Sequence, residues 1–140
     1  MISTCRGIFA QRVLLWRWQS AMNQISKGND VVGLEILQSL EAPNYIEIII
    51  KVQIADCYFR LGRHNQAFEI YRQVEHLNFP ARLAQDDVAY IIAYSKFYQN
   101  RILESQGEPK LLHDDSKIRT DLRKPNVAGR LRRHYLPCPV

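Results

Sequence analysis

The residues best suited to catalysis or metal binding are scattered along this chain. The four histidines are His64, His76, His113 and His134. No two of them have the His-x-x-x-His spacing that brings two metal ligands to one helix face. His113, Asp114 and Asp115 form a tight group, but they lie in a Lys- and Gly-flanked stretch that we expect to be loop. The chain also lacks a glycine-rich phosphate-binding loop. We therefore expect no metal, no cofactor and no enzymatic activity.

The cysteines do not form a recognisable site either. Cys5, Cys57 and Cys138 are odd in number, far apart and without a Cys-x-x-Cys pair. They alone build neither a disulfide framework nor a four-ligand zinc site, so we expect a reducing compartment. Cys57 is predicted to be a small packing residue on a helix rather than a nucleophile.

A basic group near the C-terminal end has the chemistry to contact an anionic surface. These residues are Arg123, Lys124, Arg130, Arg132 and Arg133. The last three precede His134 and Tyr135, and guanidinium groups beside an aromatic ring can contact phosphates and stack on a base. The alternative is an ordinary basic tail.

Charge is divided unevenly along the chain. Residues 1–29 hold four basic residues and residues 122–140 hold five, with no acid in either segment. All 14 acids lie in residues 30–121, whose net charge is −4. Basic ends on an acidic body are typical of chains whose ends meet nucleic acid, lipid headgroups or an acidic protein. The alternative is that the charge serves only solubility.

The first residues also bear on targeting. Arg6 and Arg12 occur with Ser3, Thr4 and apolar residues, which is the composition of a mitochondrial transit segment. A secretory signal fits badly because Gln11 and Arg12 interrupt its apolar region. We expect a mitochondrial protein, with a cytoplasmic one as the alternative. The structural alternative is that this N-terminal segment is simply the start of the first helix.

The size and composition are those of one globular domain. The chain has 140 residues, 46% hydrophobic and 24% charged. Its longest unbroken run of aliphatic or aromatic residues other than alanine, Val13 to Trp16, has four residues, against about 18 for a spanning helix. We expect no transmembrane segment.

A period of 34 residues relates residues of similar size. The matched pairs are Gly28 and Gly62, Ala21 and Ala55, Gly33 and Ala67, Leu37 and Tyr71, and Leu40 and Val74. Small residues match small ones and large apolar residues match large ones. A fixed period of this length predicts a repeat architecture.

Apolar residues at helical spacing predict five helices. They lie near residues 12–26, 30–40, 45–61, 65–77 and 85–103. Gly28 and Gly62 should end the first and third helices, and Asn29 or Asp30 should cap the second through a side-chain oxygen. Residues 46–54 are rich in β-branched residues and favour a strand when considered alone. We predict a helix there because no second strand is available to pair with them.

The pattern in residues 48–81 resembles the tetratricopeptide repeat family. From Ile54 it reads Ile-Ala-x-x-Tyr-x-x-x-Gly-x-x-x-x-Ala-x-x-x-Tyr-x-x-Val, followed by Phe79-Pro80. Lys51 stands where the family usually has a Trp, and residues 14–47 match the family less fully. The resemblance implies an all-α solenoid of short antiparallel helix hairpins, about two to two-and-a-half repeats long. A capping helix would follow Asp87, with an extended basic C-terminal tail after it.

The resemblance also implies a partner-binding groove lined by the first helix of each hairpin. Carried over position by position, its residues are Leu15, Trp18, Gln19, Met22, Ile49, Val52, Gln53, Asp56, Phe59 and Arg60, extended by Tyr90, Tyr94 and Phe97. Family members that clamp acidic chaperone tails have Lys and Asn at places held here by Trp18, Met22, Val52 and Asp56. We therefore expect an apolar groove for a helix or extended segment of a partner. The alternative places Trp18 and Met22 in the core.

Together these patterns predict a basic N-terminal arm in residues 1–13, a repeat domain in 14–103 and a basic tail in 104–140. The expected function is that of a non-enzymatic adaptor or accessory subunit of a multi-subunit assembly. The alternative is a basic-armed subunit of a mitochondrial ribonucleoprotein that contacts RNA through its tail.

Overall fold

The computed structural model describes residues 2–41, 44–79, 81 and 83–107, and these residues form helices and connecting turns without any strand. The helices are α1 (Ile2–Ser26), α2 (Asp30–Gln38), α3 (Asn44–Arg60), α4 (His64–Glu75) and α5 (Gln85–Ser105). The all-α prediction is confirmed. The predicted helix ends lie within two residues of those observed, except at the start of the first helix.

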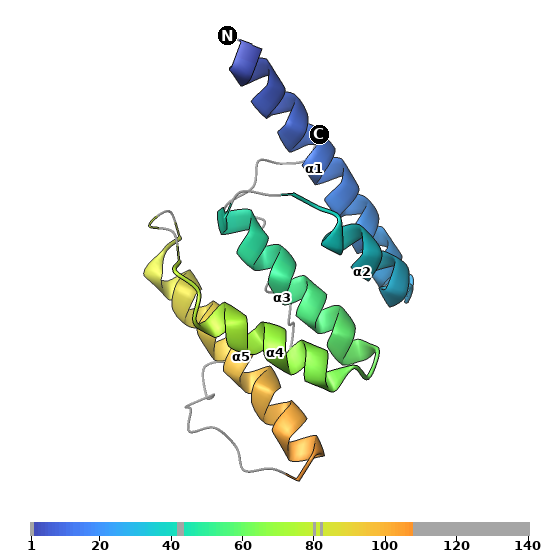
Figure 1. Ribbon diagram of the computed structural model, residues 1–140, viewed down its shortest axis with the longest axis vertical. Coiled ribbons are helices and arrows are strands. Elements are labelled where there is room, and N and C mark those ends of the chain that lie inside the picture. The colour runs from blue at the N-terminus through green and yellow to red at the C-terminus, as the bar shows by residue number, and fades with distance from the viewer. Residues whose placement is uncertain (1, 42–43, 80, 82, 108–140) are drawn as a thin grey trace.

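The first helix is longer than predicted. We expected it near residues 12–26, but α1 begins at Ile2 and thus includes most of the segment expected as a basic arm. The chain has no proline before Pro43, so nothing in this segment forbids the helical backbone. Figure 1 shows the N-terminal half of α1 extending beyond the other helices. The tail residues 108–140, including Arg123, Lys124, Arg130, Arg132 and Arg133, lie outside the described residues.

The 34-residue period of the sequence is also a period of the local backbone structure. Gly28 and Gly62 have φ of +83° and +77°, which confirms them as helix stops. The amide of Asn29 donates to the carbonyl of Gln24 at 2.9 Å, and Arg63, 34 residues later, donates to Tyr58 at the same distance. The turns α1–α2 and α3–α4 therefore close in the same way.

The expected side-chain cap of the second helix is wrong. Asn29 occupies the N-cap position but makes no capping hydrogen bond through its side chain. The side-chain amide nitrogen of Asn29, Nδ2, instead donates a hydrogen bond to Oε1 of the Gln24 side chain at 2.9 Å. Asp30 begins the helix and pairs with Arg60 of α3.

The helices pack chiefly on their neighbours in the chain: α1 on α2, α2 on α3, α3 on α4, and α4 on α5 (Figure 1). Polar contacts reinforce several of these pairs. Arg60 Nε lies 2.9 Å from Asp30 Oδ1 between α3 and α2. Glu75 on α4 accepts a hydrogen bond of 2.9 Å from Gln99 and lies 3.5 Å from the Lys96 ammonium on α5.

Helix α3 explains why residues 46–54 resemble a strand in sequence. Its buried side chains are Ile46, Ile48, Ile49, Ile50, Val52, Gln53, Ala55 and Cys57. A helix covered on several sides is apolar around most of its circumference, so the usual helical period is weak. The helix prediction for this segment is confirmed.

Candidate partner-binding surface

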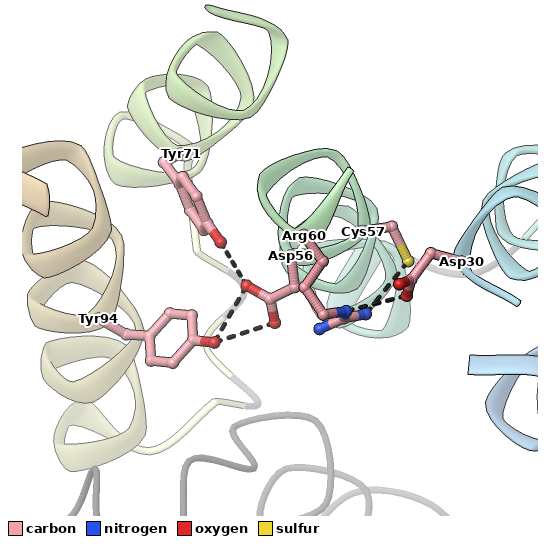
Figure 2. Close-up of polar contacts among 6 residues, drawn as sticks. All are labelled: Asp30, Asp56, Cys57, Arg60, Tyr71 and Tyr94. Atoms are coloured by element: carbon pink, nitrogen blue, oxygen red, sulfur yellow. Dashed lines mark hydrogen bonds and ion pairs between the residues drawn. The ribbon is translucent and has the colours of Figure 1, made fainter. Parts of the chain in front are cut away.

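Three helices meet at the carboxylate of Asp56 (Figure 2). The hydroxyl of Tyr94 on α5 lies 3.0 and 2.9 Å from its two oxygens. Tyr71 on α4 donates a short hydrogen bond to Oδ1 of the same carboxylate. Asp56 itself is on α3, so this polar centre joins the last three helices.

Burial controls the ionisation of this centre. It raises the pKa of Asp56 from 3.8 to about 6, although the two tyrosine hydrogen bonds and the charge of Arg60 act in the opposite direction. Burial, and then the Asp56 charge, raises the pKa of both Tyr71 and Tyr94. At neutral pH the carboxylate is therefore ionised, and both phenols keep the protons that they donate.

Cys57, which directly follows Asp56, and Arg60, one turn further along α3, lie toward α2 (Figure 2). Arg60 Nη2 is 3.5 Å from the Cys57 sulfur, and its Nε bonds Asp30. Burial is the main cause that raises the pKa of Cys57 to about 11. The thiol is protonated at neutral pH, which agrees with its expected packing role.

Trp18 of α1 is a core residue in this structure. It is 1% exposed, and its indole N–H donates to Gln53 Oε1 at 2.5 Å. The amide nitrogen of Gln53 lies 2.8 Å from the sulfur of Met22. Because the buried Gln53 satisfies the indole N–H, the whole ring can be enclosed between α1 and α3. Trp18 therefore does not lie on an open groove, and the core alternative describes it.

The predicted groove residues divide by exposure. The buried members, at most 5% exposed, are Trp18, Ile49, Val52, Gln53 and Tyr94, so a partner cannot reach them without displacing the chain's own side chains. The half-buried members are Leu15, Gln19, Met22, Asp56, Phe59, Tyr90 and Phe97, and Arg60 is exposed. These eight remain accessible at least in part.

An aromatic patch, defined as Phe59, His64, Phe97, Tyr98 and Arg101, lies between the end of α3, the start of α4 and α5. Phe59 stacks on His64 with ring centroids 5.2 Å apart and meets Tyr98 edge-on at 5.1 Å. The Arg101 guanidinium lies 6.0 Å from the centroid of Phe59 and 5.9 Å from that of Phe97. Arg101 is exposed, and the other four residues are half-buried.

Sequence reasoning missed Tyr98 as a member of this surface. The signal was present, because Tyr90, Tyr94 and Tyr98 follow one another at intervals of four residues. That spacing places aromatic residues along one ridge of a helix. The role of Tyr71 as a donor to Asp56 was also missed, because the two residues lie on different helices.

Within the described residues, no group of three or more His, Cys, Asp or Glu residues is placed to hold a metal ion. None of the helices in that part of the chain is long and apolar enough to cross a membrane. No protein-family model, curated protein or solved structure matches the chain.

Proposed function

We propose that this protein is a non-enzymatic adaptor or accessory subunit, built as a short tetratricopeptide-like array. In this proposal an apolar helix or extended segment of a protein partner lies along α1, α3 and α5. The half-buried side chains of the aromatic patch, together with Met22 and Leu15, supply its contacts.

The observation that carries the proposal is the way these alternate helices meet. Trp18 and Met22 of α1 contact Gln53 of α3. Phe59 of α3 meets Tyr98 of α5 at 5.1 Å between ring centroids. Three non-consecutive helices thus contribute apolar and aromatic groups to adjoining positions, as the first helices of tetratricopeptide hairpins do.

The repeated turn geometry supports the same architecture. Two hairpins with matching backbone hydrogen bonds, 34 residues apart, are followed by a further helix, α5. Helices that pack mainly on their chain neighbours are typical of repeat arrays. So short an array buries little core, which favours a stable partner.

Comparative affinity purification tests the proposal. The full chain is compared with the double variant Met22→Ala/Phe59→Ala and with a control, Val31→Ala/Val32→Ala, which truncates two exposed residues of α2. Circular dichroism first establishes that each variant is folded, and quantitative mass spectrometry then identifies the captured proteins.

We expect a specific protein to be captured by the wild type and the control and lost with the Met22 and Phe59 double variant. A captured set that is unchanged in the double variant would count against the proposal. A double variant that simply unfolds would show that the two residues belong to the core.

A further inference from the structure

The outward face of α1 is the most exposed apolar feature in the described part of the chain. Trp16 is 75% exposed and Val13 is 38% exposed. The buried residues Leu14, Trp18 and Ala21 occupy the opposite side of the helix, toward α2 and α3. Among the side chains that the structure describes, α1 therefore has a covered apolar face and, on the other side, an exposed apolar stripe made of Val13 and Trp16.

The two end helices differ in the face they expose. The exposed residues of α5 are mainly polar, namely Gln85, Asp86, Ala89, Arg101, Glu104 and Ser105. Helical arrays need such a polar outer face where stacking ends. Helix α1 also exposes polar residues, namely Arg12, Arg17, Ser20, Asn23 and Ser26, but α5 exposes no large apolar side chain comparable to Trp16 and Val13.

The outward stripe, made of Val13 and Trp16, indicates what would cover it. These residues are three positions apart, so their side chains lie side by side as one narrow ridge on α1. Such a ridge packs between the side-chain rows of a second helix. Helices that lie in a lipid interface instead present a broad apolar face.

The charged residues beside the stripe determine which kind of partner helix can bind there. Arg12 and Arg17 are exposed and border the stripe on either side, next to Val13 and Trp16 in sequence. Residues 1–29 contain no acidic residue, so a second copy of α1 would place like charges across the seam. An anionic bilayer would also attract these arginines, so vesicle binding is one of the outcomes that the test distinguishes.

We infer that the outward face of α1, centred on Trp16 and bordered by Arg12 and Arg17, docks an amphipathic helix of a partner protein whose flanking residues are acidic. This interface is separate from the proposed partner-binding surface, to which Met22 of α1 and Phe59 of α3 contribute. One chain then joins two partners, or two segments of one partner.

Fluorescence anisotropy with a designed peptide tests the inference on the full chain. The probe is a labelled helical peptide with Leu at the a and d positions and Glu at the e and g positions. The matched control peptide has the same Leu residues with Lys at e and g. The protein variants are Trp16→Ala, Arg12→Glu/Arg17→Glu and, as a control on the other face, Met22→Ala/Phe59→Ala.

We expect the Glu peptide to bind more tightly than the Lys peptide. Trp16→Ala should weaken this binding by at least about tenfold, since a central aromatic anchor carries much of the energy of such an interface. Arg12→Glu/Arg17→Glu should reverse the peptide preference, and Met22→Ala/Phe59→Ala should leave it unchanged. An unchanged melting temperature in Trp16→Ala separates lost binding from lost folding.

Three results would overturn the inference. The first is equal binding of the two peptides, or Glu-peptide binding that Trp16→Ala leaves unchanged. The second is a homodimer, seen by analytical ultracentrifugation, that Trp16→Ala dissociates. The third is Trp16-dependent binding to phosphatidylserine-containing vesicles without binding to the Glu peptide.

Discussion

The hydroxyl of Tyr94 on α5 lies within 3.0 Å of both carboxylate oxygens of Asp56 on α3, although the residues are 38 positions apart in the chain. This contact holds the last helix in a defined register against the central one. It also places the Asp56 carboxylate, whose pKa burial raises to about 6, at the junction of three helices, so we expect the stability of this junction to depend on pH.

The stability conferred by Asp56 should increase as the pH falls. Its pKa is raised from 3.8 to about 6 on folding, so between these values the folded state binds more protons than the unfolded state. Stability from this group is therefore full below pH 4 and is lost as the pH rises through 6. Relative to Asp56→Asn, the wild-type free energy of unfolding should rise by about 2–3 kcal/mol from pH 7 to pH 4. Urea unfolding of both proteins at each pH measures it, and a difference independent of pH would contradict the prediction.

Substitution by alanine should lower the free energy of unfolding strongly at Trp18 and hardly at all at Trp16. Trp18 is 1% exposed and hydrogen-bonded to Gln53, so Trp18→Ala should cost about 3–5 kcal/mol and unfold much of so small a domain. Trp16 is 75% exposed, and Trp16→Ala should change the free energy of unfolding by less than about 0.5 kcal/mol. Thermal melts of the two variants measure the contrast. Similar losses in both variants would refute the burial assigned to α1.

The two helix-ending glycines should be equally sensitive to a side chain. Gly28→Ala and Gly62→Ala each force a β-carbon into the left-handed region, at a cost of about 1–2 kcal/mol. Similar losses are expected because the two turns have the same hydrogen bonds. Ser20→Ala, at an exposed helical position of α1, serves as the control. Stabilisation by alanine at either glycine, measured by chemical denaturation, would be inconsistent with these turns.

The basic tail provides a test of the ribonucleoprotein alternative. If the residues from Arg123 to Arg133 contact phosphates, four or five contacts predict a slope of roughly −3 to −4 for log affinity against log salt. RNA binding by the intact chain and by a chain ending at Lys124 should be compared between about 50 and 200 mM salt. The alternative predicts binding that weakens with both salt and truncation. Undetectable RNA binding, or binding insensitive to both, would eliminate tail-driven RNA recognition.

The local structure of this protein could be predicted from its sequence. The spacing of apolar residues and the positions of Gly28 and Gly62 predicted five helices and the turns at which two of them end. These signals are local, because a helical period and a left-handed glycine act within a few residues. The same reasoning correctly identified residues 46–54 as a helix despite their β-branched composition.

The roles of individual side chains depended on the tertiary structure. Trp18 and Trp16 lie two residues apart on one helix, and only the packing of α1 against the other helices buries the first and leaves the second exposed. Asp56 meets Tyr94 because α4 packs on both α3 and α5, and no local pattern encodes the resulting register. Burial and hydrogen-bond partners arise from contacts between distant segments, and no local pattern encodes them. The sequence alone therefore determined the helices. The packing of α1, α3 and α5 decided which of their residues form core and which form surface.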